Sequence, residues 1–254
     1  MRPATNALAC LLLMTFATAA ISQDSAQDYH SLLARPGRPS EDAERDAASK
    51  PAEVLAFMGI KPGQTVLDFQ AAGGYFSELL SYAVGPTGKV YAHNHSREGV
   101  LGPEVFERRY GNNRLPNVEQ IFARHQDLHL PKASLDAVLM SMVYHDTYYY
   151  RDGLDWGPVD HAAFLAELRN ELKPGGTITV IDHAAAPGSD PYKSAVATHR
   201  IDKSIVLRDF TAAGFTLVAD SDLLRNPQDK PDVQIFEPSV YRETDRFMLR
   251  FRKP

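Results

Sequence analysis

The sequence contains almost no cysteine: among 254 residues there is one, Cys10, and it lies in an apolar N-terminal segment. The rest of the chain therefore has no means of forming a disulfide, a cysteine-ligated zinc site or a thiol nucleophile. A lipid anchor at Cys10 is disfavoured, because a lipid-attachment cysteine should follow the apolar run and Cys10 precedes most of it. Catalysis or binding must rely on other side chains.

Basic runs are also absent. The net charge is −5 and no cluster of Lys or Arg stands out, which argues against nucleic acid as the main partner and leaves a small molecule as the expected substrate. The composition, 44% hydrophobic and 23% charged, is ordinary for a soluble globular protein. The length suits one α/β domain with additions, and it suffices to bury a full core. The sequence does not indicate an oligomeric state.

A long hydrophobic run is missing as well. The apolar stretch from Ala7 to Phe16 is too short to span a bilayer comfortably. Together with Arg2 before it and the small residues Ala17-Thr18-Ala19 after it, this stretch is typical of a secretory signal. We predict cleavage after Ala19 or Ala20, a periplasmic or secreted protein, and no stable membrane insertion after cleavage. The chain then divides into a signal peptide (1–20), a flexible N-terminal arm (21–39) and one domain (40–254).

Strand-like and helix-like patterns alternate along this domain. Strands are expected at Thr65–Phe69, Lys89–Asn94, Val118–Ala123, Leu135–Met142 and Thr177–Asp182. Helices are expected over Ser40–Ile60 with an interruption at Pro51, and over Gly74–Val84, Pro103–Tyr110, His161–Leu172 and Ser204–Ala213. This alternation predicts an α/β fold with a mainly parallel sheet covered by helices on both faces. The turn Lys173-Pro174-Gly175-Gly176 should separate the helix His161–Leu172 from the strand Thr177–Asp182. The last two strand patterns, Phe215–Ala219 and Arg246–Arg252, have no helix between them and fit an antiparallel edge hairpin.

The stretch TVLDFQAAGGYFSELL, residues 65–80, is the first candidate site. In open α/β sheets, ligands bind beyond the carboxyl ends of the strands. Small residues there permit close approach to the backbone, Asp68 can accept a hydrogen bond from an ammonium or hydroxyl, and Gly73-Gly74 leads into a helix N-terminus that favours an anion. Asn94 ends the second strand, where an acid commonly binds ribose hydroxyls. A tight turn without a ligand is the alternative.

A second candidate site follows the fourth strand, in the segment MVYHDTYYY. His145 is a candidate general base because its unperturbed pKa lies near neutrality. Asp146 would orient His145, and Tyr144 would position an acceptor. The alternative is that this segment only packs a loop, with an aromatic cluster around Tyr148–Tyr150.

The end of the fifth strand and the segment before the last helix lie on the same rim. His183 is a further catalytic candidate, and Asp182 and His199 are candidates for substrate binding. Arg200 would bind an anionic group bidentately, unless the stretch HRID is a helix cap with a salt bridge. The set His145, Asp182, His183 and His199 also has the donor types of a zinc or iron site. Because no HxH or HExxH spacing occurs, we predict no metal.

Three segments resemble the class I S-adenosylmethionine-dependent methyltransferases: TVLDFQAAGGYFSELL, LDAVLMSMVYHD and LKPGGTITVIDH. Their order and spacing are similar to the first, fourth and fifth strands of that family. The flanking stretches RDAASKPAEVLAFMGIKPGQ and TDRFMLRFRKP look like one branch of exported bacterial predicted methyltransferases. The resemblance covers about residues 40–254. It implies a Rossmann-like seven-stranded sheet, S-adenosylmethionine as cofactor, and methyl transfer to an unknown small or medium acceptor.

The resemblance also implies roles for individual residues. The family loop reads acidic-x-Gly-x-Gly-x-Gly, and its positions fall on Asp68, Gln70, Ala72 and Gly74; the branch often has a bulky residue at the first glycine. These residues and Gly73 would face the methionine end of the cofactor, and Asn94 the ribose. Asp127 and Leu128 would lie by the adenine, and Ser141 under the sulfonium. The methyl group of Ala72 is expected to weaken cofactor binding or shift its geometry.

Two other functions fit the same residues. One is a non-catalytic periplasmic protein that binds a ligand in the same cleft. The other is a metal-dependent enzyme built on the His and Asp side chains of the rim. A methyltransferase should bind both the methyl donor and its demethylated product, whereas a metalloenzyme should carry stoichiometric metal.

Overall fold

The computed structural model of the chain describes residues 28–95, 101–152 and 158–254. The predicted signal peptide and its cleavage sites lie outside these residues. Among the helices in these three ranges, none is long and apolar enough to cross a membrane.

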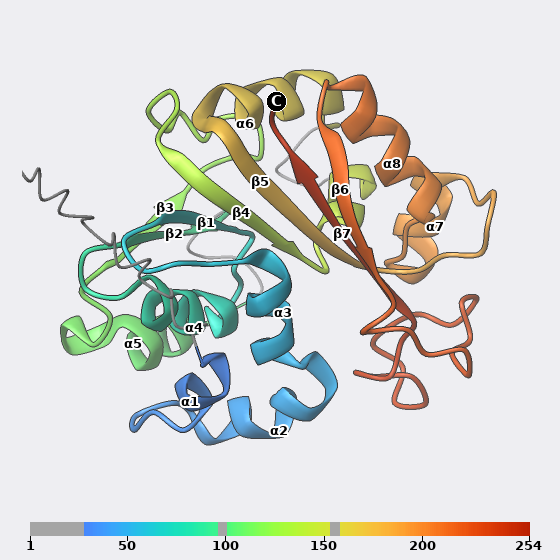
Figure 1. The fold of residues 1–254 in the computed structure, drawn as a ribbon. Coiled ribbons are helices and arrows are strands. Elements are labelled where there is room, and N and C mark those ends of the chain that lie inside the picture. The colour runs from blue at the N-terminus through green and yellow to red at the C-terminus, as the bar shows by residue number, and fades with distance from the viewer. Residues whose placement is uncertain (1–27, 96–100, 153–157) are drawn as a thin grey trace, which may run out of the picture.

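One seven-stranded sheet forms the centre of the molecule (Figure 1). Its order is β3-β2-β1-β4-β5-β7-β6. The strands are β1 (Thr65–Phe69), β2 (Lys89–Asn94), β3 (Val118–Phe122), β4 (Leu135–Ser141), β5 (Leu172–His183), β6 (Thr216–Ser221) and β7 (Arg246–Arg252). The first five strands are mutually parallel, and β7 lies antiparallel between β5 and β6. The predicted fold class is confirmed, including the antiparallel C-terminal edge.

The strand order reverses between β1 and β4. Leu67 of β1 pairs with Tyr91 of β2 on one side and with Val138 of β4 on the other. The chain therefore leaves the carboxyl ends of β1 and β4 in opposite directions, and in open α/β sheets ligands bind at such a reversal point. Both candidate sites from the sequence lie at this reversal point.

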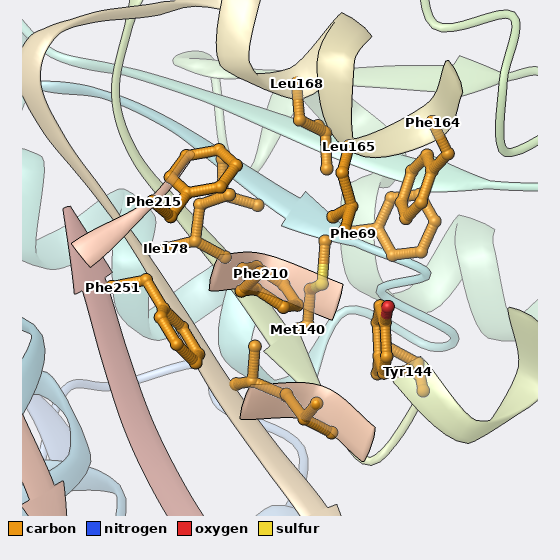
Figure 2. Packing of buried hydrophobic residues seen from close by; sticks show 14 of the residues in the cluster. Phe69, Met140, Tyr144, Phe164, Leu165, Leu168, Ile178, Phe210, Phe215 and Phe251 are labelled. Atoms are coloured by element: carbon orange, nitrogen blue, oxygen red, sulfur yellow. The ribbon is translucent and has the colours of Figure 1, made fainter. Parts of the chain in front are cut away.

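Helices cover both faces of the sheet (Figure 1). Period-two alternation along the strands supplies an apolar row to each face. Val66 and Leu139 pack with α3 and α4, whereas Phe69 and Met140 pack with α6 and α8, as Figure 2 shows for the second cluster. The helices are α1 (Tyr29–Leu33), α2 (Ser40–Ser49), α3 (Pro51–Met58), α4 (Tyr75–Val84), α5 (Pro103–Tyr110), α6 (His161–Glu171), α7 (Pro191–Thr198) and α8 (Lys203–Ala212), with short 3-10 turns η1 (Gly111–Asn113) and η2 (Tyr144–Tyr148).

Three elements differ from the sequence prediction. The stretch Lys173–Gly176 belongs to β5 rather than to a turn, and β5 pairs with β4 through a register shift between Leu135 and Ala137. Helix α7 was not predicted, although Asp190 caps it by accepting a hydrogen bond from Lys193 N at 2.9 Å. Part of the predicted arm forms α1, which is anchored where the Tyr29 hydroxyl donates to the Ile60 carbonyl at 2.6 Å.

Candidate active site

The loop after β1 has a left-handed backbone at every second residue. The φ angle is +52° at Gln70, +48° at Ala72 and +76° at Gly74. These are the three positions at which the methyltransferase loop pattern has glycine. A side chain in this conformation costs roughly 1–2 kcal/mol, so the backbone shape is retained here at the expense of strain at two residues. Such strain persists only where neighbouring groups hold the backbone.

Asn94, the last residue of β2, holds Ala72 in place. Its Oδ1 accepts a hydrogen bond from the Ala72 N–H at 2.9 Å, and its Nδ2 donates to the Ala72 carbonyl at 3.2 Å. An amide can make both bonds, whereas a carboxylate has no hydrogen to donate. This double contact gives a physical reason for Asn where an acid is usual. The Asn94 amide is thus engaged with the loop, and the predicted ribose contact would compete with these bonds.

Arg109 of α5 holds the next residue of the loop. Its Nε donates to the Gly73 carbonyl at 2.8 Å, and its guanidinium forms buried ion pairs with Asp42 of α2 and Glu78 of α4. Gly74 is packed so tightly that a Cβ would lie 2.1 Å from the hydroxyl oxygen of Tyr110. Packing under α5 and the left-handed backbone therefore favour glycine at position 74, whereas a Cβ at Gly73 would make a tight contact with Val105 at 3.0 Å.

Asp68 is bonded to helix α4. Its carboxylate accepts a hydrogen bond from Ser77 Oγ at 2.6 Å, and the residue is 2% exposed. Burial raises the pKa of Asp68 to about 6, although the hydrogen bond from Ser77 opposes this rise. Asp68 thus connects β1 to the first turn of α4, and its partner is a hydroxyl of the chain itself, one of the two donor types that the sequence led us to expect.

Two histidines surround Phe69 at the ends of β2 and β3. Their ring centroids lie 4.8 Å (His93) and 5.4 Å (His125) from that of Phe69. Burial lowers the pKa of His93 to about 4 and that of His125 to about 3, so both rings are neutral at physiological pH. Gln70 Nε2 lies 2.7 Å from His125 Nε2, and this contact joins the β1 loop to the segment after β3.

Three further residues were predicted to bind the cofactor. Asp127 and Leu128 follow His125 in the sequence, and Ser141 is the last residue of β4. Asp127 is exposed and Leu128 is buried. Ser141 ends β4, and its Oγ is buried without a hydrogen-bond partner in the described part of the chain. Met142 after it is left-handed, with φ +60°. Because an unpaired buried hydroxyl costs free energy, Ser141 marks a point where a polar atom of a bound molecule would be favoured.

His145 lies between two carboxylates at the ends of β4 and β5. Its Nδ1 is 2.7 Å from Asp182 Oδ1, and its Nε2 is 3.2 Å from Asp146 Oδ1. Burial alone would lower the pKa of His145, but Asp182 and Asp146 together raise it well above the ordinary value. Both ring nitrogens therefore face carboxylates, an arrangement that favours the protonated ring. A general base needs a nitrogen lone pair, so the predicted role of His145 would require loss of the proton at one of these contacts, and it stays a prediction.

Asp182 is an orienting group for His145. It is fully buried, and its Oδ2 also accepts a hydrogen bond from the His145 backbone N–H at 2.9 Å. Burial and the nearby cations lower the pKa of His183 well below its ordinary value, and its Nδ1 contacts Thr244 Oγ1 at 2.7 Å. His199 Nδ1 lies 3.6 Å from Asp146 Oδ1. The structure thus brings together His145, Asp146, Asp182 and His199, and the ring centroid of His183 lies 5.9 Å from that of His145.

Two predicted site residues point elsewhere. The Tyr144 hydroxyl donates to Asp209 of α8 at 2.9 Å inside the core, away from the rim, so Tyr144 is not placed to position an acceptor. Arg200 is completely buried and pairs with Asp229 at 2.5 Å. Asp202 caps α8 by accepting from Ser204 N. The alternative of a cap with a salt bridge is therefore the correct interpretation of HRID, and Arg200 has no guanidinium group free for a substrate.

Sequence reasoning missed His93, His125, Arg109 and Asp229. His93 and His125 follow or end predicted strands, so their place at the carboxyl edge was a usable signal. Arg109 and Asp229 had no such signal, because their partners lie 36 and 29 residues away along the chain.

Comparison with known proteins supports a methyltransferase assignment for the central part of the chain. Residues 67–180 match the family model of a methyltransferase domain. A demethylmenaquinone methyltransferase of Geobacillus stearothermophilus is 31% identical over 135 residues, which are 53% of this chain and 51% of that protein. The chain spans about half the length of the curated relatives it matches.

Solved structures share the fold over most of this chain. A SAM-dependent methyltransferase from Aquifex aeolicus has a TM-score of 0.59 at 22% identity, covering 90% of this chain and 100% of its own. The 1,6-didemethyltoxoflavin-N1-methyltransferase of Burkholderia thailandensis, solved with 1,6-didemethyltoxoflavin and S-adenosylhomocysteine, has a TM-score of 0.54 at 18% identity, with coverages of 89% and 84%. At these identities the likeness establishes the fold, which is the Rossmann-like fold of these enzymes.

Proposed function

We propose that this chain is a class I S-adenosylmethionine-dependent methyltransferase that acts on a small or medium acceptor. The observation that carries the proposal is the alternating left-handed backbone at Gln70, Ala72 and Gly74. The loop has the backbone shape of the glycine pattern, although Gln70 and Ala72 stand at two of the three glycine positions. A turn needed only to join β1 to α4 would have no reason to retain strain of roughly 1–2 kcal/mol at each of two residues.

The β1 loop and Ser141 fit the cofactor. The backbone of Gln70, Ala72 and Gly73 would hold the methionine end, and Asp127 and Leu128 would flank the adenine. The hydroxyl of Ser141, which is buried and unpaired among the described residues, would hydrogen-bond to the cofactor below its reactive centre. Asn94 is assigned a positioning role through Ala72, and Asp68 and Gly74 support the loop from the side of α4. Bound S-adenosylmethionine supplies an electrophilic methyl group.

The acceptor would enter beside β4 and β5. Methyl transfer needs donor and acceptor held close and in line, and the ion-paired His145 makes a rigid wall for this purpose. Asp146 is the more exposed carboxylate of the network, with 30% of its side chain accessible, and would accept a hydrogen bond from the acceptor. Asp182 orients His145, and His183 and His199 complete the rim.

Aromatic side chains at this rim favour a planar acceptor. The ring of Tyr149 stacks on His199 with centroids 4.7 Å apart, and Phe236, which is 60% exposed, lies 5.3 Å from the same ring. Tyr192 of α7 is also exposed. Flat apolar rings gain both buried area and stacking energy on such a surface.

The substitution Ser141→Ala tests the cofactor site. Removing a buried unpaired hydroxyl should leave the melting temperature unchanged or raise it, whereas loss of one neutral hydrogen bond should weaken S-adenosylhomocysteine binding about 2- to 12-fold. Ser134→Ala is the matched control, because the Ser134 hydroxyl is also buried and unpaired among the described residues but precedes β4 at the opposite edge of the sheet. Equal affinities for both variants would contradict the proposal.

We also propose export. Residues 1–20 would be removed as a signal peptide, leaving the domain in the periplasm or outside the cell. Mass spectrometry of the protein from its native host should find an N-terminus at Ala20 or Ile21, and an intact Met1 would refute export by this route.

A further inference from the structure

Three potential metal ligands converge at the rim, independently of the cofactor loop. They are His145 and Asp146 in η2 and His199, which ends α7. Their ligand atoms all lie within 4.8 Å of one another. The elements that supply them are separated by about fifty residues of sequence, and they meet only because η2 and α7 pack side by side at the carboxyl ends of β4 and β5.

The distances fit a common coordination centre. A metal that binds nitrogen and oxygen at about 2.0–2.2 Å in tetrahedral geometry places its ligand atoms about 3.3–3.5 Å apart. The separations are 3.2 Å between His145 Nε2 and Asp146 Oδ1, and 3.6 Å between Asp146 Oδ1 and His199 Nδ1. The third separation, between the two imidazole nitrogens, is within 4.8 Å. His199 is the side chain that can move, since it is partly exposed whereas His145 is buried.

The surroundings of His145 are those of a metal ligand. Asp182 is fully buried and faces Nδ1 at 2.7 Å, which fixes the ring so that Nε2 points toward Asp146. A carboxylate behind a ligating imidazole is the usual support of a histidine–metal bond. With neutral imidazoles, Asp182 and Asp146 would contribute two negative charges at the same point. A divalent cation balances that charge, and it would replace the proton on Nε2.

The backbone also holds the third ligand toward this centre. His199 has a left-handed backbone, with φ +53°, and its ring stacks on Tyr149. His199 is the C-cap of α7, where a left-handed residue is common, and the end of this helix brings its ring to the rim. Asp146 and His199 retain 30% and 19% of their side-chain exposure, so the centre can be reached from solvent.

We propose that His145, Asp146 and His199 bind one divalent first-row transition metal, with Asp182 as the supporting group of His145. Two imidazoles and one carboxylate favour zinc or iron over magnesium, which prefers oxygen ligands. The three ligands leave at least one coordination position for water or another molecule. The inference does not depend on the cofactor site, because none of these residues is assigned to the cofactor; the metal would lie on the side proposed for the acceptor.

The test is calorimetric titration of Zn²⁺ into the chelator-treated full chain, with Mg²⁺ as a comparison. We expect one zinc per chain and little heat from Mg²⁺. His199→Ala should weaken zinc binding at least 100-fold, and Asp182→Asn should weaken it 10- to 100-fold. His129→Ala is the matched control: His129 also lies 3.4 Å from a carboxylate, that of Glu167, but its side chain is 79% exposed and it is not among the three clustered ligands, so zinc affinity should stay within twofold. If Asp182→Asn fails to fold, Asp146→Ala, at a more exposed position, is the replacement variant, and it should also weaken zinc binding.

Cobalt gives a second readout. A Co²⁺-loaded chain should show the visible absorption of a four-coordinate centre, and His199→Ala should abolish it. The proposal is overturned if the folded chain fails to bind zinc at millimolar concentration, or if His199→Ala and Asp146→Ala bind it as tightly as the unaltered chain, which would identify adventitious binding elsewhere.

Discussion

The substitution Asn94→Asp separates two roles for this residue. The variant keeps the acceptor for the Ala72 N–H but loses the donor to the Ala72 carbonyl, and it places a carboxylate oxygen about where the amide nitrogen lies, 3.2 Å from that carbonyl. Loss of one hydrogen bond together with this repulsion should lower the free energy of unfolding by about 1–2 kcal/mol. For a domain of this size that corresponds to a melting temperature lower by about 2–8 °C.

The expected change in cofactor affinity has the opposite sign under the two roles. If Asn94 holds the loop, Asn94→Asp loosens Ala72 and weakens S-adenosylhomocysteine binding. If Asn94 only contacts a ribose, the acid supplies a charge-assisted hydrogen bond and strengthens binding. Differential scanning fluorimetry and calorimetry measure the two effects, and Asn112→Asp, at an exposed position, controls for the added charge. Tighter binding without loss of stability would refute the loop-holding role.

Three other substitutions follow from the same contacts. Ala72→Gly removes left-handed strain of about 1–2 kcal/mol but adds a backbone-entropy cost of about 0.5–1 kcal/mol, so stability should be unchanged or slightly higher. Ala166→Gly, at an exposed position inside α6, should lose about 1 kcal/mol. An equal loss in both variants, measured by urea unfolding, would be inconsistent with strain at Ala72. Arg200→Ala leaves Asp229 buried without its partner and should cost about 3–5 kcal/mol; a loss below about 1 kcal/mol in the same assay would mean that the pair is solvated. Burial raises the pKa of Asp68 in the folded state to about 6, so the folded state binds this proton more tightly than the unfolded chain does. The free energy of unfolding should therefore fall as pH rises from 4 to 6. Asp68→Asn should flatten this part of the stability profile, and an unchanged slope would speak against a raised pKa.

Much of the fold could be predicted because it follows from local patterns. The apolar run of β4 and the alternation from β1 to β5 indicated the parallel sheet, and element boundaries mostly fell within two residues of the observed ones. Local patterns say nothing about which strands pair, so the insertion of β7 between β5 and β6 was not available from sequence. Helix α7 was missed although Asp190-Pro191 is a capping signal.

The sequence predicted which residues lie together in the candidate site, but not which hydrogen bonds they make. Residues that follow parallel strands reach one edge, and on this basis His145, Asp146 and Asp182 were correctly expected to lie together. Hydrogen-bond partners depend on side-chain direction, which strand ends do not determine. The sequence alone therefore could not predict that both nitrogens of His145 face carboxylates. Nor could it predict that the Asn94 side chain bonds to the backbone of Ala72.

The most direct test of the central claim is calorimetric titration of the purified chain with S-adenosylmethionine and S-adenosylhomocysteine. The account predicts one binding site per chain, micromolar affinity corresponding to about −8 kcal/mol, and weaker binding in Ser141→Ala but not in Ser134→Ala. A folded chain that binds neither compound at millimolar concentration would contradict the proposed function.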